Sequence, residues 1–212
     1  MRLRKKHWAI PEMQENPYVY FDAKDYKGKW KEVFGNNNEI HIEIGAGKGA
    51  FIQELARRNP DINYVIIEKE SNAFVYATRK VQEDELKNVR ALPIDAETLL
   101  EYFDENEIER IYINFCNPWP KPRHHKRRLT YPAFLNIYEQ ILKNGSRIYM
   151  KTDDQDLFDA TLEYVNESRF CILKSDKDMK LENYPDNIVT EYESKWRSQN
   201  IPICYGIFEL NK

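Results

Sequence analysis

Residues 40–49 read IHIEIGAGKG, and this stretch decides the fold. Its first five residues, with isoleucine at positions 40, 42 and 44, are typical of a short strand. Gly45, Gly47 and Gly49 follow, and glycine permits a tight turn and a close backbone approach to a ligand. An amphipathic run then continues until Pro60, which stops a helix. A glycine-rich turn between a strand and a helix indicates a nucleotide-binding α/β fold.

Strand-like and helix-like runs alternate after this turn. Further strands are expected at 64–67, 89–94, 108–115, 147–151, 170–173 and 205–210, with amphipathic runs between most of them. This alternation predicts an α/β, doubly wound, Rossmann-like fold. We expect a mostly parallel seven-stranded sheet with an antiparallel C-terminal edge hairpin.

Local signals predict where several helices begin and end. Ser71 and Thr130 are candidate N-caps, and Asn144-Gly145 is a candidate helix end. Residues 1–25 contain Pro11 and Pro17, and we expect them to form an irregular basic extension that contacts RNA.

The composition fits one domain over residues 1–212. The chain is 42% hydrophobic and carries a net charge of −3. Its three cysteines are widely spaced, which disfavours a disulfide framework or a zinc site and favours the cytoplasm. Neither a signal peptide nor a membrane span is expected. The sequence does not fix the oligomeric state, and we expect a monomer or a homodimer.

Acidic residues stand at the ends of three predicted strands. Glu68 lies at the position where an acid accepts hydrogen bonds from ribose hydroxyls, and Asp95 can accept from an adenine amino group. Glu43, beside the glycine loop, would repel a pyrophosphate but suits a cationic sulfonium or ammonium group. The set therefore favours S-adenosylmethionine over a dinucleotide. The alternative is that Glu68 and Asp95 are ordinary solvated acids or helix caps.

A rigid turn and a basic run follow the fourth predicted strand. Two prolines in Asn117-Pro118-Trp119-Pro120 fix an extended turn that projects Asn117 from the strand end. Residues 121–128 then carry five cations and no acid, which suits binding to RNA phosphates. The alternatives are a solvated surface run and a structural turn with Trp119 in the core. No nearby Cys or Glu completes a ligand set with His124 and His125, so we expect no metal site.

These motifs together resemble the bacterial tRNA (guanine-N7-)-methyltransferases. The resemblance runs from about Asn16 through nearly all of the chain. Its carriers are Asn16-Pro17-Tyr18, the stretch 26–30, the stretch 43–49, Glu68, Asp95, the stretch 117–121, the stretch 123–129, Lys151-Thr152-Asp153 and Thr190-Glu191-Tyr192-Glu193. The family methylates N7 of guanine 46 in the tRNA variable loop, with S-adenosylmethionine as the donor.

The resemblance also implies roles for individual residues. The donor would be bound by Glu43, Glu68, Asp95 and Asn117 together with the loop glycines. Substrate would contact Lys121, Asp153 and Thr190, Glu191, Tyr192 and Glu193. RNA would engage Arg123, His124, His125, Lys126, Arg127 and Arg128. From the residues alone, Asp153 also fits a helix cap, and Thr190 with Glu193 fits a capping box.

Asn117 departs from the family pattern, in which an aspartate is usual at this position. A neutral amide cannot act as a general base. Guanine N7, however, carries a lone pair and no proton, so in-line attack on the donor methyl needs alignment rather than a base. We therefore expect Asn117 to orient the donor or the base by hydrogen bonding.

Two other functions remain open from the sequence. Asn117-Pro118-Trp119 also resembles the turn of methyltransferases that act on amino groups of RNA or protein. A non-catalytic RNA-binding protein on the same scaffold is the second alternative. A nicotinamide oxidoreductase is disfavoured by Glu43 and by the basic run.

Overall fold

The computed structural model describes residues 6–212, which form two compact units that meet in sequence at Phe103 and Asp104. The elements of the first unit are α1 (Ala9–Glu15), η1 (Lys24–Tyr26), α2 (Trp30–Phe34), β1 (Ile40–Ile44), α3 (Ala50–Arg58), β2 (Asn63–Ile67), α4 (Ser71–Glu83), β3 (Val89–Leu92) and η2 (Ala96–Glu101). The η elements are short 3₁₀ helices. The strands and helices agree with the predicted alternation.

The sheet of the first unit has the strand order β3-β2-β1, and both pairs are parallel. Every residue of β1 and β2 is buried, as expected for parallel strands covered on both faces. In the register, Ile44 pairs with Ile67, and Ile67 pairs with Leu92. The carboxyl ends of all three strands therefore meet at one edge, where the glycine loop begins.

Helix α4 follows the predicted pattern but starts differently. Its buried residues include Phe74, Ala77 and Val81. The prediction that Ser71 is the N-cap is wrong, because Glu70 occupies that position and its carboxylate accepts from the backbone N of Asn72. Ser71 is the first helical residue.

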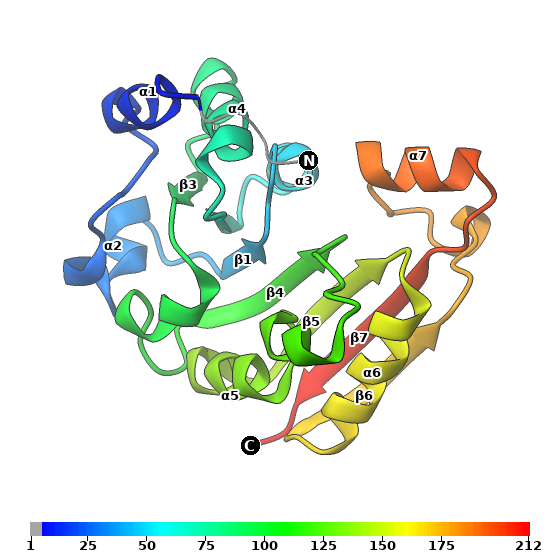
Figure 1. The fold of residues 1–212 in the computed structure, drawn as a ribbon. Coiled ribbons are helices and arrows are strands. Elements are labelled where there is room, and N and C mark those ends of the chain that lie inside the picture. Colours follow the sequence, from blue (N-terminus) through cyan, green and yellow to red (C-terminus); the bar gives the residue numbers. More distant parts are fainter. Residues whose placement is uncertain (1–5) are drawn as a thin grey trace. The chain divides into compact units, whose positions relative to one another are not determined.

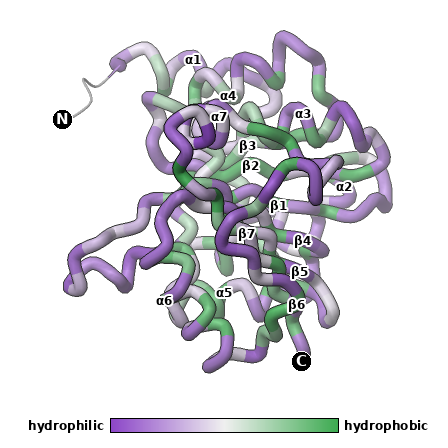
Figure 2. The backbone as a smooth tube through the Cα atoms, turned by 90° about the vertical axis from the view of Figure 1, so that its right-hand side faces the viewer, coloured by the Kyte–Doolittle hydropathy of each residue, from purple (hydrophilic) through white to green (hydrophobic). Residues whose placement is uncertain are grey.

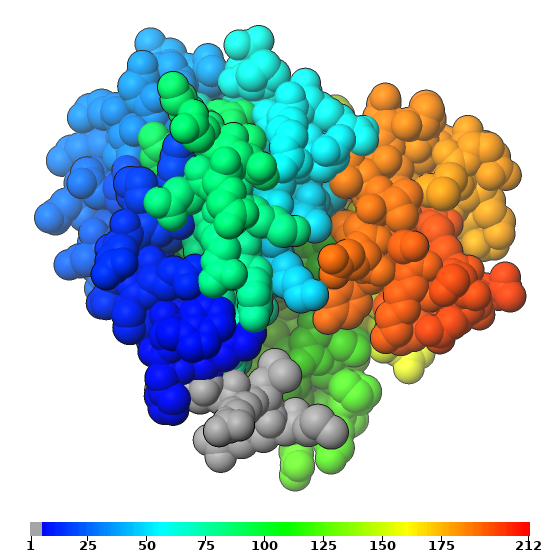
Figure 3. Space-filling view, turned by 90° about the horizontal axis from the view of Figure 1, so that it is seen from above, coloured from blue at the N-terminus to red at the C-terminus, as the bar shows by residue number. Residues whose placement is uncertain are grey.

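The N-terminal segment is less irregular than predicted. Helix α1 contains Pro11 in its first turn, where the missing N–H removes no intrahelical bond. The helix lies beside α4 (Figures 1 and 3), and Arg79 donates two hydrogen bonds of 2.8 Å to the Glu12 carboxylate. Within the expected basic extension 1–25, Arg2, Arg4 and Lys5 lie outside the described residues.

The second unit is built on four strands. Its elements are β4 (Ile108–Asn114), η3 (Pro122–Arg127), α5 (Pro132–Ile141), β5 (Leu142–Thr152), α6 (Gln155–Asn166), β6 (Phe170–Asp176), η4 (Leu181–Asn183), α7 (Glu191–Ser198) and β7 (Cys204–Leu210). The strand order is β4-β5-β7-β6, with β4 parallel to β5 and β7 antiparallel to both of its neighbours. The predicted antiparallel edge is confirmed, and residues 177–203, including α7, connect β6 to β7.

Helices α5 and α6 pack on one face of this sheet (Figure 1). Hydrophobic and hydrophilic residues alternate along both helices (Figure 2), as expected for helices with one buried face. Buried side chains of α5 are Phe134, Leu135, Tyr138 and Ile141, and those of α6 are Leu157, Phe158, Thr161 and Val165. The core of the unit therefore lies between these helices and the sheet.

Two predicted boundaries of α5 are wrong. Tyr131 occupies the N-cap position before Pro132, while the Thr130 hydroxyl is buried and lies 2.7 Å from that of Thr161. At the other end, β5 starts directly after the helix at Leu142, so Gly145 does not end a helix. Its φ of +77° falls in the part of β5 where the register with β4 shifts. Within residues 6–212, no helix is long and apolar enough to cross a bilayer.

Candidate functional site

The glycine loop at the end of β1 has the backbone that its sequence predicts. Gly45, Gly47 and Gly49 all have positive φ, a region that side chains other than glycine rarely adopt. A Cβ on Gly49 would lie 2.7 Å from the Cβ of Ala77, so this glycine lets α3 pack against α4. A Cβ on Gly47 would meet no atom within 4 Å, which leaves open space in front of the loop.

Glu68, at the end of β2, is joined to this loop. Its Oε2 accepts a hydrogen bond of 3.2 Å from Gly47 N, and its Oε1 accepts one of 2.8 Å from Glu70 N. The loop itself is fixed to β2, because the backbone N atoms of Gly45 and Ala46 both donate to the carbonyl of Ile67. The structure therefore brings the predicted ribose-binding acid directly against the glycine turn.

Asp95 and Glu43 occupy the neighbouring strand ends. Asp95 lies three residues beyond β3, where its side chain caps η2 and accepts 2.9 Å from Lys69 Nζ. Helix capping was the alternative role predicted for Asp95. The ion pair between Lys69 and Asp95 is largely exposed. Glu43 lies in β1 and its side chain is buried. A buried acid beside an open glycine loop fits a cationic donor better than a pyrophosphate.

The residues present therefore fit S-adenosylmethionine as a methyl donor, with acids for its polar groups and open space at Gly47. Among residues 6–212, no cluster of three or more His, Cys, Asp or Glu side chains is placed to hold a metal ion.

In the second unit, the turn after β4 presents Asn117 to solvent. The Asn117 Oδ1 accepts a long hydrogen bond of 3.5 Å from Trp119 N, and Trp119 has a φ of +46°. The half-buried Trp119 ring carries the Arg127 guanidinium 5.1 Å from its centroid and the His124 ring edge-on at 5.7 Å. The turn and the basic run thus pack on each other as one surface element.

Most of the predicted RNA-binding side chains face outward. Lys121, Arg123, Lys126 and Arg127 are exposed, and the two histidines are half-buried. Arg128 differs from the prediction, because it is only 3% exposed and its Nε donates 2.9 Å to the Pro118 carbonyl. A buried guanidinium that braces the turn is poorly placed to reach a phosphate, so the structure favours a structural role for Arg128.

Cys116 precedes Asn117 and is not a nucleophile. Burial raises the pKa of the Cys116 thiol to about 12, so the group stays protonated at neutral pH. The polar chemistry at this strand end therefore comes from Asn117 and its neighbours.

Asp153 lies at the end of β5 and is free of the capping role that its sequence also allowed. The N-cap of α6 is Asp154, whose Oδ1 accepts 2.7 Å from Leu157 N. Asp153 is half-buried, and burial raises its pKa above the ordinary value, an effect that Lys195 partly opposes. The structure therefore leaves this carboxylate available to a ligand.

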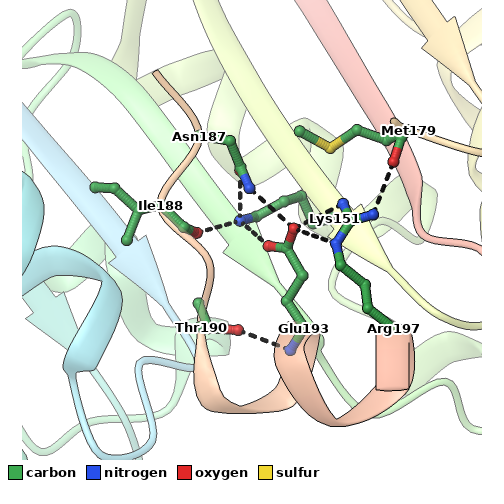
Figure 4. A network of polar contacts seen from close by, with 7 residues as sticks. All are labelled: Lys151, Met179, Asn187, Ile188, Thr190, Glu193 and Arg197. Carbon is green, nitrogen blue, oxygen red and sulfur yellow. Dashed lines mark hydrogen bonds and ion pairs between the residues drawn. The ribbon is translucent and has the colours of Figure 1, made fainter. Parts of the chain in front are cut away.

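The segment from Thr190 to Glu193 divides into exposed and buried parts. Thr190 caps α7 by accepting 3.1 Å from Glu193 N, which is half of the predicted capping box. Glu191 and Tyr192 are exposed, whereas Glu193 is completely buried. The Glu193 carboxylate turns to Lys151 of β5 instead of back to the cap (Figure 4).

A network of buried polar contacts surrounds Lys151 (Figure 4). Its Nζ donates to Glu193 Oε2 at 2.8 Å, to the Ile188 carbonyl at 2.9 Å and to Asn187 Oδ1 at 3.1 Å. Glu193 Oε1 accepts from Asn187 Nδ2 and from two nitrogens of Arg197. The network closes around a lysine to which the sequence alone assigned no separate role.

A sequence model of the family described as "Putative methyltransferase" matches residues 37–205, which covers most of both units. The chain is 48% identical to "tRNA (guanine-N(7)-)-methyltransferase" of Clostridium tetani, over 99% of this chain and 100% of that protein. It is 49% identical to the protein of the same name from Clostridium acetobutylicum, with the same coverage. The chain belongs to the tRNA (guanine-N(7)-)-methyltransferase family.

Solved structures support the fold of this family member. "Structure of an Antibiotic Related Methyltransferase" covers 91% of this chain and 96% of its own, with a TM-score of 0.67 and 18% identity. "Crystal Structure of 16S rRNA Methyltranferase KamB" has the same TM-score at 10% identity and covers 91% and 95%. The Rossmann-like methyltransferase fold and the family resemblance predicted from the sequence are both confirmed.

Two features of this methyltransferase-family chain escaped sequence reasoning. The buried contact of Arg128 with the turn joins residues ten positions apart, and the Lys151 network joins β5 to a helix some forty positions later. Neither leaves a periodic pattern. The available signal was a lysine directly after the apolar residues Ile148, Tyr149 and Met150.

Proposed function

We propose that this chain transfers a methyl group from S-adenosylmethionine to N7 of guanine 46 in the variable loop of tRNA. The observation that carries the proposal is the full-length match to relatives that bear the name of this activity. The free thiols and the RNA substrate suit a cytoplasmic protein.

The first unit supplies the donor-binding groups in this proposal. The glycine loop and Glu68 bind the ribose portion, Asp95 accepts from the adenine amino group, and Glu43 faces the charged end of the donor. The donor, when bound, supplies an electrophilic methyl group on a positively charged sulfur.

The second unit supplies the RNA-binding groups. Lys121, Arg123, Lys126 and Arg127 are exposed in a stretch without acids, which favours contacts with phosphates. His124 and His125 add hydrogen bonding or stacking. Arg128 supports them by holding the turn rather than by contacting RNA.

The substrate base is assigned to the groups near the end of β5 and the start of α7. Lys121, Asp153, Thr190, Glu191 and Tyr192 form this set, and Glu193 of the same segment is buried and holds α7 in place. The carboxylate of Asp153 can accept hydrogen bonds from the donor edge of guanine. It also places negative charge near a base that becomes cationic on methylation.

Asn117 performs positioning rather than proton transfer in this mechanism. Guanine N7 has no proton to remove, so the bond to the methyl carbon forms as the bond from carbon to sulfur breaks. The rate then depends on alignment of the nucleophile, which an amide can support by hydrogen bonding. The proposal therefore requires an active protein with asparagine at position 117.

Methyl transfer to unmodified tRNA, followed by nucleoside mapping, tests the proposal. We expect 7-methylguanosine at position 46, detected by chain cleavage after borohydride and aniline treatment. A methylated amino group instead would identify the amino-group methyltransferase alternative. Binding of tRNA without calorimetric binding of S-adenosylmethionine would identify a non-catalytic RNA-binding protein. The same two binding measurements on Glu68→Ala provide the control for the donor site. We expect this variant to lose donor binding while it retains tRNA binding.

A further inference from the structure

Tyr192 presents an aromatic ring to solvent beside the substrate-binding groups. It exposes 61% of its surface, more than any other large hydrophobic side chain described in residues 6–212. Its ring stacks near that of Phe115, which directly follows β4, with centroids 6.4 Å apart and planes 19° apart. Phe115 is itself held with a φ of +51°. The pair therefore forms an aromatic platform supported at its base and exposed at Tyr192.

The buried network fixes this platform. Glu193 is the one buried residue of α7, so apolar packing contributes little to seating the helix. The Lys151 ammonium that binds Glu193 also lies 6.0 Å from the centroid of the Phe115 ring. In addition, Phe115 N donates 2.8 Å to the Lys151 carbonyl. Lys151 thus contacts both Glu193, which is next to Tyr192 in the chain, and Phe115, whose ring stacks near that of Tyr192.

The energetics favour a geometric role for this network. Burying an ion pair carries a desolvation cost that apolar residues of similar volume would avoid. The network instead fixes α7 in one place through directional contacts with Lys151 and Arg197. Single-stranded bases are commonly recognised by stacking on aromatic side chains.

We propose that Tyr192 is the stacking platform for the target guanine, and that Glu193 is a positioning residue that acts through Tyr192. The inference rests on the proposed function. Methylation at N7 gives the base a positive charge, and the face of a phenol ring attracts a cation more than a neutral ring. Stacking therefore strengthens towards the transition state, which is the condition for raising kcat.

Replacement of Tyr192 by Phe, Leu and Ala tests the platform. We expect Phe to keep near wild-type kcat/KM, and Leu and Ala to lose roughly tenfold to a hundredfold. The dissociation constant for tRNA should change less, because phosphate contacts dominate it. Val189→Ala, an exposed apolar neighbour before α7, is the control and should match wild type. A Leu variant as active as wild type would overturn the proposal.

A second measurement separates this inference from the proposed function. Transfer RNA with 2-aminopurine at position 46 should show fluorescence quenching with wild type and not with Tyr192→Leu. This readout needs no methyl transfer. Quenching without 7-methylguanosine formation would leave the platform intact and refute the proposed function. Equal fluorescence with both proteins would overturn the platform.

A double-mutant cycle tests the positioning role. Glu193→Gln keeps the side-chain shape but turns an amide towards the donors of Asn187 and Arg197. We expect it to lower kcat/KM and to weaken the 2-aminopurine quenching. Combined with Tyr192→Ala, it should add almost no further loss, because Glu193 acts through the ring. Additive losses in kcat/KM would overturn the positioning role, whatever the melting temperatures of the variants.

Discussion

Replacing Arg123 and Lys126 with glutamine tests whether the basic run contacts phosphates. Both side chains are exposed, and the run 121–128 contains no acid to balance them. Each phosphate contact contributes roughly 0.7 to 0.9 to the slope of log affinity against log salt. The double variant should therefore lower the slope by about 1.4 to 1.8. Between roughly 50 and 200 mM salt, wild type should lose about tenfold more affinity than the variant.

The assay is fluorescence anisotropy of labelled, unmodified tRNA over a series of salt concentrations. Lys177→Gln with Lys180→Gln is the matched control, because it changes the net charge equally. Those lysines pair with Asp159 and Asp178, so their replacement should leave the slope unchanged. An unaltered slope for the first variant, or an equal change for the control, would refute a phosphate role for the run.

Three further predictions concern single residues. Because burial raises the pKa of Asp153, its ionisation opposes folding as the pH rises through that pKa, so Asp153→Asn should raise the melting temperature at neutral pH. This gain in melting temperature should vanish towards acidic pH. The kcat/KM of the variant should fall, because the target guanine loses a neighbouring carboxylate. A lower melting temperature at neutral pH would contradict the burial argument. Gly49→Ala should destabilise the fold by at least about 1 to 2 kcal/mol, which is roughly the cost of a left-handed backbone for a residue other than glycine. The new Cβ would also collide with Ala77, which adds to this cost. An unchanged denaturant midpoint would count against the prediction. Asn117→Asp should leave guanine methylation intact in steady-state assays. If the protein with Asn117 is inactive and Asn117→Asp restores activity, the positioning role of Asn117 is wrong.

The sequence predicted those features that a local pattern encodes. The strand before the glycine loop, and the acids at the ends of β1 to β3, were visible because strand ends and glycine turns have fixed residue requirements. Helix α1 was missed because Pro11 was taken as a breaker, although proline is tolerated in a first turn. Thr130 was taken as a cap because its hydroxyl suits one, but Thr161 in another helix binds it.

The misassigned and missed residues share a physical cause. Arg128 ends a run of cations, and nothing in that run shows that its last member turns inward to the Pro118 carbonyl. The partner of Glu193 is likewise set by tertiary structure, since the local capping pattern predicted a backbone donor. Long-range polar contacts of this kind depend on the packed fold and leave no periodic trace in the sequence.

The position of β7 in the sheet has a consequence for biosynthesis. β7 lies between β5 and β6, and it supplies the strand pairing of β6 among the described residues. A ribosome delivers β5 and β6 before β7, so neither strand can complete its ladder until β7 has also been made. The second unit therefore reaches its native strand order only after residues 204–210 have left the exit tunnel, whereas the parallel strands of the first unit can pair earlier.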